Sequence, residues 1–280
     1  MNEKKFSIEK NTVAETLVIP LYARKLSTEI YPNLFEDRES IELIEKIDYD
    51  FSKLKSKSKS LMHKFGALEI AMRQSDLAIE IKEYMRTHPK ASIVNLGCGL
   101  DQTGESCDNG LCKIYNIDYY NVIEIRNRLL GEKDRVINIS TDLNNIKWFD
   151  LIDSSNGVVF FASGVFYYFK TEDIKSLFLN MEKRFSNSIL VFDAAGKRAV
   201  KMMIKTWLKQ AGIVELEDFF YVDNIEDELI PWLKHTKVSS RGYMLGYNDL
   251  KDKSISRVFR LFSKYCDNRL HMQIVKLEFK

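Results

Sequence analysis

Glycine and acidic residues follow several short apolar runs in this sequence, where a folded chain could hold a ligand. The run at 91–97 leads into Gly97-Cys98-Gly99, and glycines allow φ > 0 and leave bare backbone for a ligand. The next run ends in Asp118, about 20 residues further on, the separation at which an acidic residue accepts both hydroxyls of a ribose. The pair predicts a site for a nucleoside cofactor.

Two further apolar runs are also followed by an acidic residue or a glycine. One closes at Asp142-Leu143 and the other at Ser163-Gly164. Each feature alone has a structural explanation, since a Gly-x-Gly turn can be only a tight turn and an Asp at a strand end can cap the next helix. Their joint occurrence on successive runs favours a binding site, because ligands of open α/β sheets lie outside the carboxyl ends of the strands.

The glycine pattern separates two classes of cofactor. A dinucleotide fingerprint needs a third glycine so that a helix N-terminus can hold the pyrophosphate, and Gln102 occupies that position. The following stretch, 103–109, is expected to be a loop. S-adenosylmethionine (SAM) needs only glycine backbone, a ribose acceptor and a cation for its carboxylate, so the pattern favours SAM over NAD.

Composition excludes several other classes of protein. The 280 residues are 45% hydrophobic and 29% charged with a net charge of +2, which is ordinary for a globular protein and gives no excess of cations for nucleic acid. No stretch approaches the roughly 18 apolar residues of a membrane span, and the N-terminus has no secretory h-region. We expect a cytoplasmic protein with no membrane partner.

Cysteine spacing gives no sign of a metal. The four cysteines lack C-x-x-C spacing and are expected to be reduced thiols, with no metal site. Their positions are Cys98, Cys107, Cys112 and Cys266.

The first 90 residues are expected to form a helical cap or lid. Apolar residues recur at helical spacing over 12–31, where Pro20 favours a kink or break, and again over 60–87, which Pro89 closes. The Lys/Ser-rich run between these segments is interpreted as solvated, with an anion site as the alternative.

Residues 91–280 are expected to form an α/β core. Five apolar runs alternate with helical patterns over 120–130, 171–185 and 197–210, which predicts a mostly parallel sheet. The segments 242–247 (GYMLGY) and 271–279 predict an antiparallel edge hairpin around a helix at 254–265. A helical insertion near 198–237 is expected to complete the lid. No Pro- or Gly-rich linker separates the parts, so one compact unit is expected.

Over residues 12–195 the sequence resembles the leucine carboxyl methyltransferase family, class I SAM-dependent O-methyltransferases with a bacterial polyketide-type branch. The motifs that carry the resemblance are AETLVIPLYARK (14–25), AMRQSD (71–76), VNLGCGLD (94–101), NID (116–118), STDL (140–143) and ASGVFYYF (162–169). The resemblance implies a class I methyltransferase-like, Rossmann-like fold, with an antiparallel edge strand near the C-terminus and added N-terminal helices.

The resemblance also implies residue roles. Arg73 would bind the methionyl carboxylate, which suits a planar guanidinium. Gly97 would lie under the methionyl group and Asp118 would hold the ribose diol, while Asp142 and the backbone of Leu143 would contact adenine. Gly99 belongs to the same turn. The family commonly has a glutamate where this chain has Ser163, which alters one polar contact, and the arginines common after the turn are missing.

The expected reaction is direct displacement by an acceptor oxygen on the sulfonium methyl, giving S-adenosylhomocysteine (SAH). Alignment can suffice for this step, so the reaction does not require a catalytic base. Possible site residues are Tyr22, Tyr167, Tyr168 and His235, each of which also fits a packing or exposed position. The aromatic run 166–169 fits either cation–π contact with the sulfonium or core packing.

The methyl acceptor is left open as a carboxylate or hydroxyl of a small molecule or a peptide carboxyl terminus. Two other functions also stay open: a non-catalytic SAM-binding protein and an NAD-dependent oxidoreductase. The sequence predicts no oligomeric state.

Overall fold

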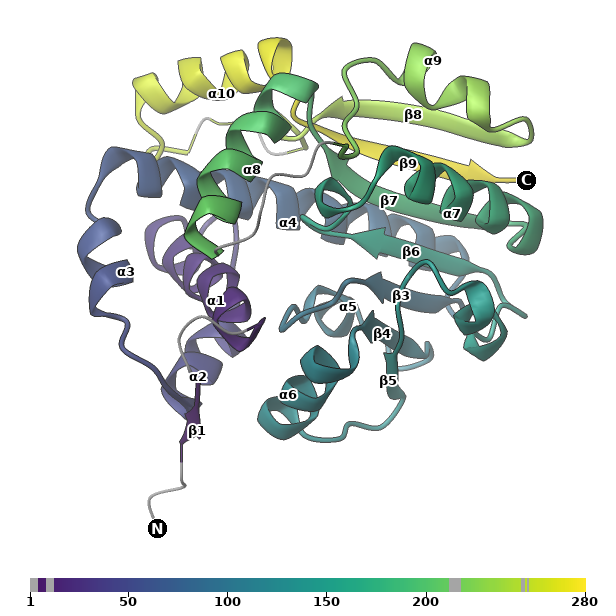
Figure 1. Cartoon of the computed structure of the whole chain (residues 1–280), viewed down its shortest axis with the longest axis horizontal. Helices are drawn as coiled ribbons and strands as arrows, with labels where there is room; N and C mark the ends of the chain where they lie inside the picture. Colours follow the sequence, from purple (N-terminus) through teal and green to yellow (C-terminus); the bar gives the residue numbers. More distant parts are fainter. Residues whose placement is uncertain (1–4, 9–12, 212–217, 248–249, 251) are drawn as a thin grey trace.

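The computed structural model describes residues 5–8, 13–211, 218–247, 250 and 252–280. Within these residues, seven strands form one sheet in the order β5-β4-β3-β6-β7-β9-β8 (Figure 1). β3 to β7 are parallel, and β9 pairs antiparallel with both β7 and β8. The strands are β3 (Ser92–Leu96), β4 (Ile114–Asp118), β5 (Val136–Ser140), β6 (Val158–Ala162), β7 (Ser188–Ala194), β8 (Thr236–Gly242) and β9 (Gln273–Phe279). The predicted α/β class, with an antiparallel edge strand, is confirmed.

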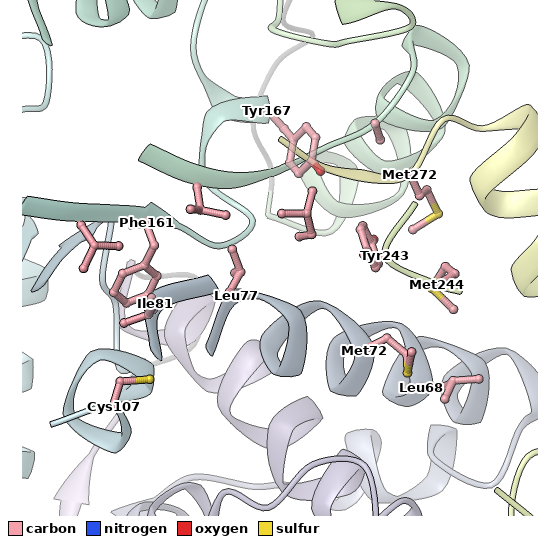
Figure 2. Close-up of a cluster of buried hydrophobic side chains, with 14 of the residues drawn as sticks. Leu68, Met72, Leu77, Ile81, Cys107, Phe161, Tyr167, Tyr243, Met244 and Met272 are labelled. Carbon is pink, nitrogen blue, oxygen red and sulfur yellow. The ribbon is translucent and has the colours of Figure 1, made fainter. Parts of the chain in front are cut away.

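The central strands β3, β6 and β7 are buried along their whole length because helices cover both faces of the sheet. In β6, Val159 and Phe161 belong to the core on the α4 side, whereas Val158 and Phe160 belong to the core that includes α7. Figure 2 shows the first of these clusters, with Leu68 and Met72 of α4 below Tyr243.

Helices connect and cover the strands. The expected crossover helices are confirmed as α6, α7 and α8, and α4 begins one residue after its N-cap Ser60. The main helices are α1 (Val13–Ile30), α2 (Arg38–Lys46), α3 (Ser52–Lys57), α4 (Leu61–Thr87), α6 (Tyr120–Leu130), α7 (Thr171–Arg184), α8 (Lys197–Ala211) and α10 (Arg257–Arg269). Shorter elements are β1 (Phe6–Ser7), β2 (Ile47–Asp48), α5 (Thr103–Ser106), η1 (Ile146–Leu151), η2 (Phe166–Tyr168), α9 (Ile225–Glu228) and η3 (Ile230–Trp232).

The chain order defines a switch point between β3 and β6. The chain runs outward from β3 through β4 to β5, then returns to add β6 and β7 on the other side of β3. Figure 1 shows the parallel strands pointing toward α1 and α8. Crevices that bind ligands lie at such a switch point, outside the carboxyl ends of the strands.

Two local predictions were wrong, and the break considered at Pro20 is absent. Residues 243–247 are not a strand but a bend, and the preceding residues form β8 instead. Residues 103–106, expected as loop, form one helical turn, α5. Pro20 lies inside an α1 helix that continues past it.

The bend at 243–247 is held by carboxylates of two helices that are distant in the sequence. The backbone N–H groups of Met244 and Leu245 donate to Asp267, and that of Tyr247 donates to Asp76. Donors used in this way cannot form a strand ladder.

Among the described residues, no helix is long and apolar enough to cross a membrane.

Candidate functional site

The first part of the site is the turn after β3. Gly97 has φ +66° and Gly99 has φ +48°, which bends the backbone toward the end of β4. The backbone N–H of Gly99 donates to Asp118 Oδ2 at 2.8 Å, and Oδ1 of the same carboxylate accepts from Tyr119 N at 2.8 Å. Burial raises the pKa of Asp118, against the lowering effect of these two bonds. The structure therefore brings together the glycine turn and the acidic residue that the sequence predicts.

Two arginines from other elements hold this turn. Arg126 of α6 donates to the carbonyls of Gly99 at 3.0 Å and Asp101 at 2.7 Å. Arg24 of α1 donates to the carbonyl of Leu100 at 2.7 Å. The arginines that the resemblance places just after the turn are thus absent from that segment, while two distant ones contact the turn.

Asp142 follows β5, whose last residue, Ser140, pairs with Asp118 at the end of β4. The preceding residue, Thr141, donates its N–H to the carbonyl of Asp118 at 2.9 Å. Asp142 is exposed and accepts from Asn144 N at 2.9 Å, whereas Leu143 is buried. The exposed carboxylate of Asp142 and the backbone of Leu143 are suited to the polar edge of a base.

Gly97 joins this part of the site to the end of β6. A Cβ at Gly97 would lie 2.6 Å from Cγ1 of Val165, closer than packed side chains approach. The close approach of the two loops therefore requires glycine at position 97.

The second part of the site is centred on an ion pair between α4 and β7. Arg73 Nη1 lies 3.2 Å from Asp193 Oδ2. The same oxygen accepts from Tyr167 OH at 3.0 Å, and Gly164 N donates to Oδ1 at 2.6 Å. Burial favours a lower pKa for Arg73, but Asp193 and other nearby groups outweigh burial and raise the pKa. A guanidinium held in this way stays charged and fixed in place.

Polar atoms beside this ion pair are left without protein partners. Among the described residues, Arg73 Nε and Ser163 Oγ are buried and have no hydrogen-bond partner. The guanidinium also packs on Gly164, where a Cβ would lie 3.3 Å from Arg73 Nη1. Buried polar atoms are normally hydrogen-bonded, so an orphaned donor and an orphaned hydroxyl at the carboxyl edge indicate a polar ligand.

Glu69 stands one helical turn before Arg73 on α4. It is partly buried, and its Oε1 accepts from Tyr243 OH at 3.2 Å. Burial raises the pKa of Glu69, while Arg73 and the Tyr243 hydrogen bond act in the opposite direction.

The aromatic candidates divide by position. Phe166 is core, packed against Phe178 and Phe192, which supports the packing interpretation for that residue. Tyr167 is buried against Asp193, and Tyr168 remains 47% exposed.

The two remaining candidates differ in environment. Tyr22 stacks on Phe51. His235 is exposed and precedes Thr236, which pairs with the last residues of β9 at the amino edge of β7. His235 is therefore far along the sheet from the glycine turn.

Sequence reasoning missed Asp193 and Glu69. Asp193 lies near the end of the apolar run 188–194 and follows the strand-end pattern that identified Asp118. Glu69 precedes Arg73 by four residues, which places both side chains on one helix face. These two signals could have found them.

The residues fit SAM. Asp118 and the glycine turn can take the ribose, Asp142 and Leu143 the adenine, and the orphaned Nε of Arg73 a carboxylate. A separate open hollow of about 460 Å³ at the amino end of β7, lined in part by Tyr84, His88 and Ser188, lies at the opposite edge.

The four cysteines are free and buried. Within the described ranges, no group of three or more His, Cys, Asp or Glu side chains could hold a metal ion.

Comparisons with known proteins identify the family and the fold. The tetracenomycin polyketide synthesis O-methyltransferase TcmP of Streptomyces glaucescens is 26% identical over 189 residues, covering 67% of this chain and 68% of that protein. A DUF574 family protein from Streptomyces avermitilis MA-4680 has a TM-score of 0.57 at 9% identity, over 92% of this chain and 97% of that chain, which shows the fold. The plantazolicin methyltransferase BpumL in complex with SAH has a TM-score of 0.46 at 15% identity, over 95% and 98% of the two chains. The leucine carboxyl methyltransferase family model matches residues 19–182, more than half of the sequence, and the chain therefore belongs to that family.

Proposed function

We propose that this protein transfers a methyl group from SAM to an oxygen of its acceptor, with the seven residues Arg73, Gly97, Gly99, Asp118, Asp142, Leu143 and Ser163 binding the cofactor. Family membership makes the chain a SAM-dependent O-methyltransferase. The observation that carries the residue assignment is the orphaned Nε of Arg73. Arg73 packs on Gly164, and the next residue, Val165, packs closely on Gly97 of the glycine turn.

Bound SAM would supply a methyl group activated by its sulfonium, and the neutral thioether left behind is an excellent leaving group. The chain's own part is to bind and orient, since alignment of the nucleophile accounts for much of such a barrier. The ion pair with Asp193 holds Arg73 in place before any ligand arrives. Pre-organised charge of this kind needs little rearrangement on binding.

The N-terminal region, residues 1–90, and the insertion near 198–237 are proposed to cover the acceptor side of the site. α1 already approaches the glycine turn, because Leu17 Cδ2 would lie 3.5 Å from a Cβ at Gly99. A cover of this kind would exclude water and select the acceptor.

The acceptor is proposed to be a small molecule, such as a polyketide-type acid or phenol, or a peptide carboxylate. We also propose that the reaction takes place in the cytoplasm, where SAM is made and used. Nucleic acid and membrane are not proposed as partners.

SAH is expected to raise the melting temperature of the full chain, whereas NAD leaves it unchanged. A ligand that binds only the native state stabilises it by mass action. NAD should not bind, because Gln102 stands where a dinucleotide site needs its third glycine to hold the pyrophosphate. Thermal unfolding with each ligand at equal concentration checks this. Equal stabilisation by NAD would favour the oxidoreductase, and no shift with SAH would remove the proposal.

Asp118→Ala is expected to weaken SAH binding by about 1.5–3 kcal/mol, the range for hydrogen bonds to a charged group. The carboxylate also accepts from Gly99 N, so Asp118→Asn should recover part of the affinity. Calorimetry with both variants makes the comparison. An unchanged affinity in the alanine variant would reduce Asp118 to a turn-stabilising residue.

A further inference from the structure

Five side chains meet between α4 and the carboxyl edge of the sheet, and their charges do not cancel. The group, here named the Arg73 cluster, consists of Glu69, Arg73, Tyr167, Asp193 and Tyr243. Its contacts are the Arg73–Asp193 ion pair, the Tyr167–Asp193 hydrogen bond and the Tyr243–Glu69 hydrogen bond. Figure 2 shows Tyr167 and Tyr243 among the buried side chains above α4.

One positive and two negative groups occupy this cluster. The positive charge of Arg73 is balanced by the negative charge of Asp193, whose side chain is only 1% exposed. Glu69 accepts a hydrogen bond from the neutral Tyr243, so no cation in the cluster balances its negative charge. Burial raises the pKa values of Tyr167 and Tyr243, and that of Cys266 to about 12, so these neighbours stay uncharged near neutral pH.

The unbalanced negative charge of Glu69 destabilises the protein when no ligand is bound. A partly buried carboxylate without an ionic partner pays a desolvation penalty, and a nearby cation offsets that penalty strongly in a low-dielectric site. The ligand that completes the cluster should therefore carry one net positive charge.

SAM and SAH differ in this respect. Both carry one ammonium and one carboxylate on the amino-acid tail. SAM adds a sulfonium and has a net charge of +1, whereas methyl transfer leaves SAH with a neutral thioether and no net charge. With SAM bound, the charges of ligand and cluster sum to zero; with SAH bound, one negative charge remains.

Resting on the proposed function, we infer that Glu69 is a specificity-determining residue that favours the charged donor over the neutral product. Its carboxylate supplies the charge that complements the sulfonium, so the product binds less tightly once the methyl has left. Glu69 thereby limits product inhibition by SAH.

The preference for SAM over SAH should increase with pH. Ionised Glu69 attracts SAM, and protonated Glu69 does not. The groups facing Glu69 are Arg73 on its own helix, Asp193 of β7, Tyr167 of η2, Tyr243 after β8 and Cys266 of α10. Because burial raises the pKa of Glu69, the ratio of SAM affinity to SAH affinity should rise with pH through a range above that of an ordinary glutamate.

Calorimetric titration of the full chain with SAM and with SAH, from pH 5.5 to 8.5, tests the inference. Glu69→Gln keeps the shape and removes the charge, so it should lower SAM affinity about tenfold, change SAH affinity less than threefold, and flatten the pH dependence of the ratio. The matched control is Glu83→Gln, an exposed carboxylate on the same helix that pairs with Arg86. It should leave both affinities unchanged.

A second variant keeps the test decisive if Glu69→Gln lowers the melting temperature of the free protein. Tyr243→Phe retains the carboxylate but removes its hydrogen-bond donor, so the rise of the affinity ratio should move to higher pH. Equal losses of SAM and SAH affinity in Glu69→Gln, or a wild-type ratio that does not vary with pH, would overturn the role of Glu69 while leaving the cofactor site intact. Binding of neither ligand to the wild type would instead remove the proposed function, and this inference with it.

Discussion

Arg73→Ala is expected to weaken SAH binding about tenfold to a hundredfold. Loss of a charged hydrogen-bonded pair costs about 1.5–3 kcal/mol, and each 1.4 kcal/mol is tenfold in affinity. The Nε of Arg73 has no partner among the described residues, so the ligand carboxylate is the group that would lose its donor. Calorimetry with SAH and with a decarboxylated analogue separates this contact, because the analogue should lose much less.

The same substitution should lower the free energy of unfolding. It leaves Asp193 buried without its cation, and breaking a buried pair typically costs roughly 3–5 kcal/mol. Asp193 keeps hydrogen bonds from Tyr167 OH and Gly164 N, so the loss should fall at or below the lower end of that range.

Two further variants make the Arg73 result interpretable. Arg73→Lys should recover part of the binding, because an ammonium keeps the charge without the planar fork. Arg86→Ala, on the exposed side of the same helix, should change neither affinity nor stability. An Arg73→Ala protein that folds and binds SAH normally would leave Arg73 with a structural role alone.

Gly97→Ala is expected to abolish detectable SAH binding and to destabilise the protein. A residue with a side chain at φ +66° pays about 1–2 kcal/mol, and the added Cβ would overlap both methyl groups of Val165. Overpacking of this kind adds about 1–3 kcal/mol. The backbone shift that relieves the overlap moves the turn away from Asp118, so affinity should fall by more than the stability loss explains.

Gly66→Ala is the matched control for Gly97. Gly66 lies inside α4, and nothing lies within 4 Å of an added Cβ there. Alanine is favoured over glycine in a helix interior by about 1 kcal/mol, so this variant should be slightly more stable and bind SAH normally. Chemical denaturation and SAH titration of both variants provide the comparison, and normal binding by Gly97→Ala would contradict the assigned turn.

Local patterns were enough to predict the five parallel strands and the proximity of the glycine turn to Asp118. The apolar runs of β3, β4, β5 and β6 are short and end in glycine or acidic residues, and each predicted end lies at the carboxyl edge. These signals are local because a buried parallel strand must be apolar and must stop where the chain turns.

The rest depended on contacts between distant segments. Asp193 and Glu69 carry local signals in their strand-end position and helical spacing, but the pairing of Asp193 with Arg73 depends on the packing of α4 on β7, which no local pattern reveals. The bend at 243–247 was mistaken for a strand because its backbone donors are used by Asp76 and Asp267. β8 was missed because its sequence, TKVSSRG, has few apolar residues, as an edge strand permits.

A crystal structure of the full chain grown with SAH would show directly where the cofactor binds. We expect the ribose at Asp118, the adenine beside Asp142 and Leu143, and the carboxylate within hydrogen-bond distance of Arg73. Density for SAH at any other place, or a bound SAH whose carboxylate does not contact Arg73, would show that the proposed site is wrong.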